Sequence, residues 1–266
     1  MLFVGFKNIL VDEKKELLKF KEKIFLLFKN CFDKEIGEDL WDWAYINNPN
    51  GNPIVSLCFD KEKLIGHYAF IPVSLIYRKE KVKAALSMTT MVDFNYRRYN
   101  IFQFQAEDVN RRALELKYHL VYGFPNRKAA PGLKKRINWV LDENSYVVNL
   151  SCDELQKMDT KDCSNTISFD IQNKSNLNWR LNKPGQHYFK KGNNILKEFG
   201  RDVDIVFNGG NFSAFEQGKR YNLLLSYEEA KLFKNNNFSY MFGYKLFDSS
   251  LNGLDFKKDL IMSDIF

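Results

Sequence analysis

The chain has 266 residues, 45% of them hydrophobic and 15% aromatic, which excludes a disordered tail and allows one large or two modest globular domains. Lysine and arginine exceed the acidic residues by 40 to 33, a moderate excess that suits anionic small molecules, nucleic acid or a membrane surface, or reflects only a coding bias. Four widely spaced cysteines form no Cys-x-x-Cys pair and lie near no histidine cluster, so we expect no metal site, no disulfide framework and a reduced, cytoplasmic setting.

The first elements read as a strand or loop followed by an amphipathic helix, since apolar residues recur at helical spacing in LLKFKEKIFLLF. Charges interrupt the apolar patches of residues 1–30, so we expect neither a signal peptide nor a membrane span. After the polar segment WDWAYINNPNGNP, the runs IVSLCFD, LIGHYAFIPVSLIY and AALSMTTMVDF are separated by short charged turns. These runs predict three consecutive antiparallel strands.

A helix is predicted after NYRRYN, because Phe102, Ala106, Val109, Ala113 and Leu116 form one apolar stripe. HLVYGF then reads as a short strand, PGLKKRI as a helix and NWVL as a return to the sheet. Residues 151–166 are polar and make the best candidate linker. We therefore expect two domains, residues 1–150 and 151–266.

The second half alternates strand-like runs, VDIVFNG, YNLLLS and FSYMFGYKLF, with the helical EEAKLFKNN, again an α/β pattern. It also contains an echo of the first half. Trp43, Asn47 and Pro49 are matched, with a one-residue slip, by the segment Trp179 to Pro184. Either an internal duplication or chance explains three matched residues.

The segment from Leu40 to Leu141 resembles the GNAT superfamily of acyl-CoA-dependent N-acyltransferases, in particular a bacterial branch associated with surface-polysaccharide genes. Five pieces carry the resemblance in order: LWDWAYINNPNGNPI, LIGHYAFIPV, ALSMTTMVDFNYRRYNIFQF, HLVYGFPN and PGLKKRINW. The closing NWRLNKPGQHY and DLIMSDIF look like the second half of the same longer proteins. The resemblance implies an α/β fold with a mixed, mostly antiparallel sheet flanked by helices, in two GNAT-like halves.

The resemblance also implies a cleft between two splayed strands, one around Met88 to Asp93 and the other HLVYGF, with the coenzyme A pyrophosphate held at the start of the next helix. A helix start offers about four unpaired N–H groups and the positive end of the dipole. The implied contacts to acetyl-CoA are Met91, Val92, Arg97, Arg98, Tyr99, Asn100, Ile101 and Phe102. The family's loop usually carries two glycines; here it reads Tyr96-Arg97-Arg98-Tyr99-Asn100. Asn100 tolerates the left-handed conformation that glycine supplies, while Arg98 either binds a phosphate or obstructs the loop.

Acyl transfer to an amine needs a proton acceptor and donors for the developing negative charge. His67 lies in the family-like GHYAFIPV and is the first candidate; the alternative is a histidine hydrogen-bonded within the sheet. Leu133 and Lys134 stand where the family often has a tyrosine that donates a proton to the leaving thiolate. Tyr122, on the neighbouring strand, is either a replacement for that tyrosine or a core residue. Asn126 is a candidate for holding a carbonyl or hydroxyl, or else a turn residue after Pro125.

From these features we expect an acetyl-CoA-dependent N-acetyltransferase acting on the amino group of a nucleotide-linked amino sugar for surface glycan synthesis, with homodimerisation left open. The alternatives are an aminoacyl-tRNA-dependent peptidoglycan-bridge transferase and a non-enzymatic, degenerate GNAT binding module. Basic residues are scattered among acids, so we expect no nucleic-acid partner.

Overall fold

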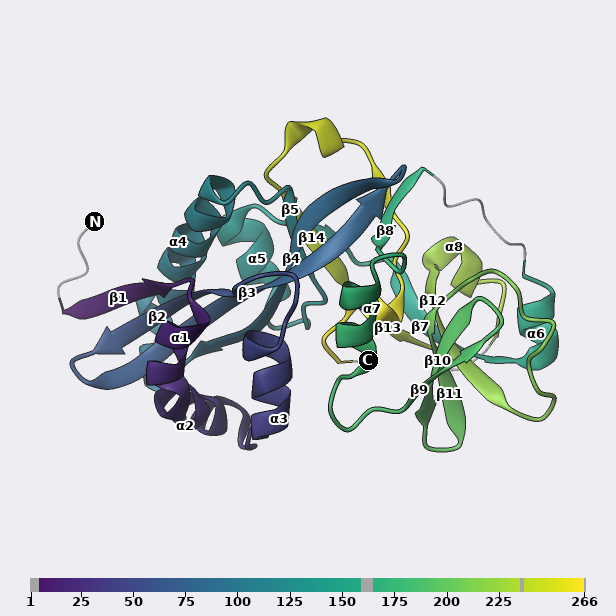
Figure 1. Ribbon diagram of the computed structural model, residues 1–266, viewed down its shortest axis with the longest axis horizontal. Helices are drawn as coiled ribbons and strands as arrows, with labels where there is room; N and C mark the ends of the chain where they lie inside the picture. The colour runs from purple at the N-terminus through teal and green to yellow at the C-terminus, as the bar shows by residue number, and fades with distance from the viewer. Residues whose placement is uncertain (1–4, 159–164, 235–236, 266) are drawn as a thin grey trace.

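The computed structural model describes residues 5–158, 165–234 and 237–265, which form two β-sheets placed side by side (Figure 1). The first sheet carries the N-terminal elements at the left of Figure 1, and the second carries the green elements at the right. The predicted class, an α/β protein with mixed, mostly antiparallel sheets flanked by helices, is confirmed.

The first sheet contains the three predicted antiparallel strands at its centre. Its strands lie in the order β1 (Phe6–Val11), β2 (Ile54–Asp60), β3 (Lys63–Tyr77), β4 (Glu80–Val92), β5 (Leu120–Gly123), β14 (Phe242–Leu246) and β6 (Val140–Asp142). Strands β4 and β5 are parallel, and the other neighbours along this path are antiparallel. The near-continuous burial of β3 shows that both of its faces are covered.

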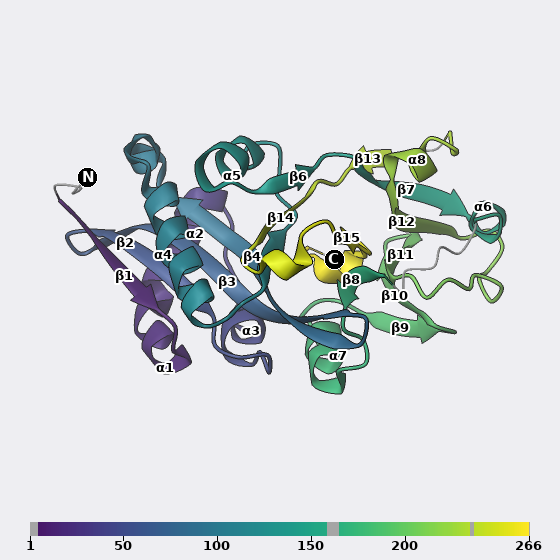
Figure 2. The ribbon, with the colours of Figure 1, turned by 90° about the horizontal axis from the view of Figure 1, so that it is seen from above.

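Helices cover the two faces of the first sheet (Figures 1 and 2). On one face lie α1 (Lys14–Leu17), α2 (Lys21–Phe32) and α3 (Glu38–Trp41), which continues as a π-helix over Asp42–Ile46. On the other face lie α4 (Ile101–Glu115) and α5 (Ala130–Ile137). Ala106, Val109 and Ala113 of the predicted stripe are fully buried, so the spacing identified the packed face of α4 correctly.

The second sheet repeats the strand order of the first. It runs β9 (Tyr188–Lys191), β10 (Asn194–Phe199), β11 (Asp202–Phe207), β12 (Arg220–Ser226), β7 (Ser145–Ser151) and β13 (Asn237–Ser239). The pair β11–β12 is parallel and the other neighbours are antiparallel, as in β2-β3-β4-β5-β14-β6. Helices α6 (Cys152–Gln156) and α8 (Tyr227–Ala230) each begin with a serine capping box.

Each sheet takes one strand from the other part of the chain. Strand β7 follows β6 in sequence but pairs with β12, whereas β14 follows β13 and pairs with β5. Strand pairing therefore crosses the predicted boundary at residue 150 in both directions. The predicted linker is helical over 152–156, because Ser151 caps that turn, and its residues 159–164 lie outside the described residues.

The two sheets meet around a pair of stacked tryptophans. The rings of Trp43 and Trp179 lie 4.9 Å apart at 7°. The indole N–H of Trp43 donates to the carbonyl of Trp179 at 2.7 Å, and that of Trp179 donates to the carbonyl of Trp43 at 2.8 Å. This reciprocity is what a local two-fold axis produces, and it involves two residues of the sequence echo.

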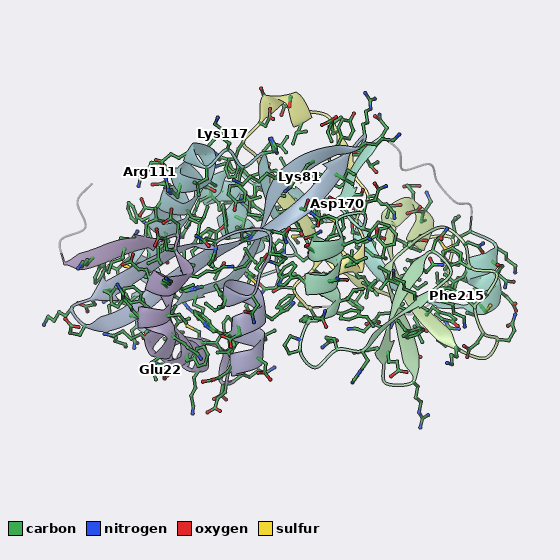
Figure 3. The ribbon with its side chains drawn as sticks, viewed as in Figure 1. Glu22, Lys81, Arg111, Lys117, Asp170 and Phe215 are labelled. Carbon is green, nitrogen blue, oxygen red and sulfur yellow. The ribbon has the colours of Figure 1, made fainter. Side chains whose placement is uncertain are left out.

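A second link joins the far end of β3 to the turn before α7 (Lys174–Leu181). There β8 (Thr166–Phe169) pairs with β3 and with β15 (Asp255–Phe256). The Ser74 hydroxyl donates to Asp170 at 3.2 Å, and Asp170 lies between the part of the molecule carrying Glu22 and the part carrying Phe215 (Figure 3). The chain segments between the sheets are therefore tied to the first sheet by polar contacts.

Candidate functional site

Strands β4 and β5 diverge after a short parallel stretch. They pair from Ala84↔Leu120 to Leu86↔Tyr122, beyond which β4 continues to Val92 without a described strand partner on that edge. A β-bulge lies in this unpaired stretch, where Thr89 and Thr90 oppose a single residue of β3 and Thr89 has φ of 56°. Apart from the carbonyls of Thr89 and Val92, which accept from His67 and Arg97, backbone groups on this edge of β4 are therefore available to an extended ligand.

The segment after β4, which the resemblance implied to be a loop leading into the next helix, forms a 3₁₀ helix over Phe94–Tyr99. Asn100 then takes the left-handed conformation, with φ of 56° and ψ of 21°, and α4 begins at Ile101. The prediction that Asn100 replaces glycine in this conformation is consistent with that geometry.

Three successive backbone N–H groups at the start of α4 remain unpaired. Within the described residues, the N–H groups of Asn100, Ile101 and Phe102 donate to no acceptor, and the Asn100 side chain makes no capping bond. The next two N–H groups bond to the Asn100 carbonyl. A left-handed residue followed by a helix start directs consecutive N–H groups toward one point, which is a concave anion site.

An ion pair and side-chain hydrogen bonds hold the 3₁₀ helix against the neighbouring strands. The buried carboxylate of Asp93 accepts from the Asn95 N–H at 3.0 Å and lies 2.7 Å from Lys63 Nζ. Burial alone would raise the pKa of Asp93, but these two partners lower it below its ordinary value. The Tyr96 hydroxyl donates to Asp60 at 2.7 Å, so the segment is held against the β2–β3 hairpin.

The two arginines of this segment bend along it and make contacts within it. Arg97 Nε donates to the carbonyl of Val92 at 3.2 Å, and its guanidinium lies 5.4 Å from the Phe94 ring centre. Arg98 Nη2 donates to the Tyr99 hydroxyl at 2.9 Å. Both side chains are exposed, so they add positive charge beside the three unpaired N–H groups.

Side chains of the first turn of α4 point into the protein while their N–H groups remain unpaired. Ile101 packs over Gly66, where an added Cβ would lie 2.6 Å from Ile101 Cγ2. Phe102 meets Tyr68 edge to face at 5.5 Å. Of the strand residues predicted to contact the donor, Met91 is buried opposite His67 and Val92 is partly buried.

His67 is sealed inside the sheet on the face covered by α1 to α3. Its Nδ1 lies 2.7 Å from the Thr89 carbonyl, which can only accept, so Nδ1 carries the proton and Nε2 is a buried acceptor without a hydrogen bond to any described residue. Burial lowers the pKa of His67 to about 4, against the effect of the Thr89 bond. The imidazole is therefore neutral at pH 7 and fixes the bulge of β4.

Tyr122 lies within β5, and Asn126 follows the end of that strand. No contact among the described residues joins either of them to His67. Tyr122 is fully buried and stacks on Phe242 at 6.0 Å, and burial raises the pKa of its hydroxyl. The Asn126 side-chain oxygen accepts from the N–H groups of Lys128 and Ala129 at 3.0 and 2.9 Å. Asn126 thus shapes the turn before α5.

The last described residues add a group that the sequence reasoning missed. Buried Arg180 donates to the carbonyls of Ile261 and Ser263, both at 2.7 Å, and Lys183 Nζ donates to the carbonyls of Asp264 and Ile265. Burial, and then the charge of Arg180, lowers the pKa of Lys183 to about 7.

The charge of Asp264, held at this position by this clamp, acts on three tyrosines. After burial, the largest cause, the charge of Asp264 also raises the pKa values of Tyr45 in the π-helix, Tyr122 in β5 and Tyr240 between β13 and β14. The pKa of Asp264 is itself raised by burial, against the charges of Lys183 and Arg180. The segments NWRLNKPGQHY and DLIMSDIF, noted for their resemblance, contain these three residues, but sequence reasoning assigned none of them a role.

In the described part of the chain, no group of three or more His, Cys, Asp and Glu side chains is arranged to hold a metal ion. Among the same residues, no helix has the length and apolar character needed to cross a membrane.

Diverging parallel strands, a bulge in the longer one, and a helix start with unpaired N–H groups between them are the arrangement of the GCN5-related N-acetyltransferase (GNAT) fold, and this chain has that fold. Among solved structures, it is similar to a GCN5-related N-acetyltransferase from Kribbella flavida, with TM-score 0.64 and 9% identity, covering 92% of this chain and 72% of the other. It is similar to a probable N-acyltransferase from Enterococcus faecalis V583, with TM-score 0.64 and 10% identity over 90% and 73% of the chains.

A putative acetyltransferase from Pyrococcus horikoshii is similar along most of both chains, at TM-score 0.52 and 16% identity over 92% and 91%. No protein-family model matches the sequence, and no curated protein matches it. At these identities the likeness establishes the fold.

Proposed function

We propose that this protein is an acetyl-CoA-dependent N-acetyltransferase whose acceptor is the amino group of a nucleotide-linked amino sugar used in surface glycans. The observation that carries the donor half of the proposal is the run of three unpaired N–H groups from Asn100 to Phe102, at the start of a 15-residue helix beside the open edge of β4. Such donors suit the pyrophosphate of a coenzyme A ester.

The bound donor would supply an acetyl thioester. The N–H groups of Asn100, Ile101 and Phe102 would hold its pyrophosphate, and the exposed Arg97 and Arg98 would add attraction for its charge. The unpaired edge of β4 offers backbone partners to the amide groups of the pantetheine arm. The chain therefore needs no glycine in the loop, because Asn100 already has the left-handed conformation.

On the acceptor side, the chain's own groups would orient the amine and take its proton. His67 is unsuited to meet solvent or substrate directly, since none of its surface is exposed, and it supports the bulge instead. Asp264 is better suited, because a raised pKa brings a carboxylate closer to the operating pH of a base. Tyr122, the candidate donor to the leaving thiolate, is as fully buried as His67, so its hydroxyl is equally unsuited to direct contact with a substrate.

Two features support an acceptor with sugar and phosphate parts. The basic excess favours an anionic substrate, and the second sheet, with its repeated strand order, lies beside the first (Figure 1) and leaves room for an acceptor larger than a simple amine. The repeated order and the reciprocal Trp43–Trp179 pair also support the expectation of two GNAT-like halves.

Calorimetry with acetyl-CoA and a thiol-release assay with a panel of amino-sugar nucleotides test the proposal. We expect saturable acetyl-CoA binding, and thiol release that depends on one of the amino sugars. Absence of both results refutes the function. An Arg97→Ala/Arg98→Ala variant keeps the backbone N–H groups and removes the two charges. Its affinity for acetyl-CoA should be lower and should depend less on the salt concentration.

A non-enzymatic acyl-CoA-binding module is the second candidate. This candidate is favoured by Leu133 and Lys134 of α5, which occupy the positions where the resemblance implies a tyrosine that protonates the leaving thiolate. Leu133 is buried and Lys134 is exposed, and neither side chain can replace that tyrosine. The same experiments separate the two candidates, because a binding module gives the calorimetric signal without thiol release from any acceptor.

A further inference from the structure

The second sheet contains its own pair of diverging parallel strands. β11 and β12 pair in parallel at Val203↔Tyr221 and Asp204↔Asn222 and then separate, as β4 and β5 do after Leu86. A cavity of about 1090 Å³ lies where they separate, lined by the last residues of both strands. Its lining also includes residues of β14, of the segment 254–259, and of β9, β10 and α7. Its position in the second sheet therefore corresponds to that of the donor cleft in the first.

The backbone of this second cleft is already hydrogen-bonded. The N–H of Asn208 donates to Asp259 at 3.1 Å, that of Gly209 to the Asn194 side chain at 2.9 Å, and that of Gly210 to the Asn208 side chain at 2.8 Å. No described helix follows β11 before β12 begins. The cavity consequently lacks the unpaired donors and the helix dipole that a pyrophosphate needs.

The charged side chains around the cavity nearly balance and are largely paired with each other. The ammonium groups belong to Lys190, Lys257 and Lys258, and the carboxylates to Asp142, Asp255, Asp259 and Glu229. Lys257 Nζ lies 3.0 Å from Asp259 and donates to the Asn208 carbonyl at 2.6 Å, while Lys258 binds Asp142. This balance gives an anion no net attraction.

Aromatic faces form the rest of the wall. Phe256 lies 5.0 Å from Phe242 and 4.8 Å from Tyr244, and all three rings line the cavity. A sugar ring matches this lining, because its C–H face packs on aromatic rings. Its hydroxyls both donate and accept, as a mixture of carboxylates, amides and ammonium groups requires. The volume is sufficient for one or a few sugar units.

From this geometry we infer that the diverging ends of β11 and β12 form a second ligand site, for a neutral or amino sugar, which is distinct from the donor cleft and does not bind coenzyme A. The inference goes beyond the acetyltransferase function, because sugar binding here requires neither the donor nor the unpaired N–H groups of α4.

Saturation-transfer NMR and calorimetric titration of the full chain with glucosamine, N-acetylglucosamine and AMP test this site. We expect at least one of the two sugars to bind saturably and AMP to give no signal at this cavity. Tyr244→Ala should weaken sugar binding about tenfold, and Asp255→Asn, an exposed isosteric change, about threefold. Phe199→Ala removes an exposed aromatic ring that is outside the cavity lining and should leave the affinity unchanged.

The inference would be overturned by the absence of saturable binding of either sugar, by sugar binding that survives both Tyr244→Ala and Asp255→Asn, or by AMP binding that is lost in those variants. Thermal melts establish whether each variant is folded. If Tyr244→Ala does not fold, the sugar affinity of Asp255→Asn tests the site. Sugar binding retained in an Asn100→Val variant that has lost acetyl-CoA binding separates this site from the proposed donor site. Displacement of the sugar by stoichiometric coenzyme A would contradict it.

Discussion

Gly66→Ala is a direct test of how α4 is seated on the sheet. The added Cβ would lie 2.6 Å from Ile101 Cγ2 and 2.7 Å from Gln105 Oε1, whereas carbon atoms prefer about 3.5–4.0 Å. Because the side chains of Ile101 and Gln105 are buried, we expect the required shift of about 1 Å to displace the first turn of α4, and overpacking of this kind costs about 1–3 kcal/mol. Since that turn carries the three unpaired N–H groups, acetyl-CoA affinity should fall together with stability.

Urea denaturation measures the free energy of unfolding, and Ile101→Ala supplies a double-mutant cycle. In the Ile101→Ala background the closest clashing atom is gone, so Gly66→Ala should cost less there than in the parent protein. Gly37→Ala is the matched control, because an added Cβ at Gly37 meets no atom within 4 Å. A loss below about 0.5 kcal/mol for Gly66→Ala, or additive costs in the cycle, would refute the packing described for α4.

Three further results are expected. Asn100→Gly should keep acetyl-CoA binding, whereas Asn100→Val should lose about 1–2 kcal/mol of stability and most of the binding, because a β-branched residue resists the left-handed conformation; equal calorimetric affinities would contradict this. His67 takes up a proton near pH 6.5 in the unfolded chain but only near pH 4 in the folded one, so the free energy of unfolding falls as the pH drops through that window. His67→Gln should remove about 3 kcal/mol of this fall, which urea titrations at several pH values would measure. Trp43→Phe and Trp179→Phe should each cost about 1–3 kcal/mol in the same assay, since each leaves a buried carbonyl without its donor; a null effect in either argues against the reciprocal pair.

The sequence predicted those parts of the fold that depend on local periodicity. The three central strands and the buried stripe of α4 follow from alternation and from 3.6-residue spacing, and β2 coincides with IVSLCFD. The run FSYMFGYKLF was read as one strand, yet it divides between β13 and β14 in different sheets. One continuous apolar run contains both strands, so the local sequence does not show where the run divides or with which sheet each strand pairs.

The candidate site was predictable to a similar extent. The resemblance pointed to Arg97 to Phe102 as the segment that holds an anion, but the 3₁₀ helix formed there depends on Tyr96 reaching Asp60 and on Asp93 pairing with Lys63. These are contacts across the fold, which spacing along the chain does not encode. For the same reason Asp264 was missed, because Arg180 and Lys183 bring it in from more than eighty residues away.

The exchange of β7 and β14 sets an order on the synthesis of this protein. As the chain leaves the ribosome, residues 6–123 can collapse early, but the edge of β5 stays open until residues 242–246 have emerged to cover it. An open strand edge invites pairing with other chains, so the nascent protein passes through a long interval of exposure to misassembly. Ribosome-stalled chains ending before residue 242 should accordingly engage holding chaperones, and release should follow once β14 has emerged.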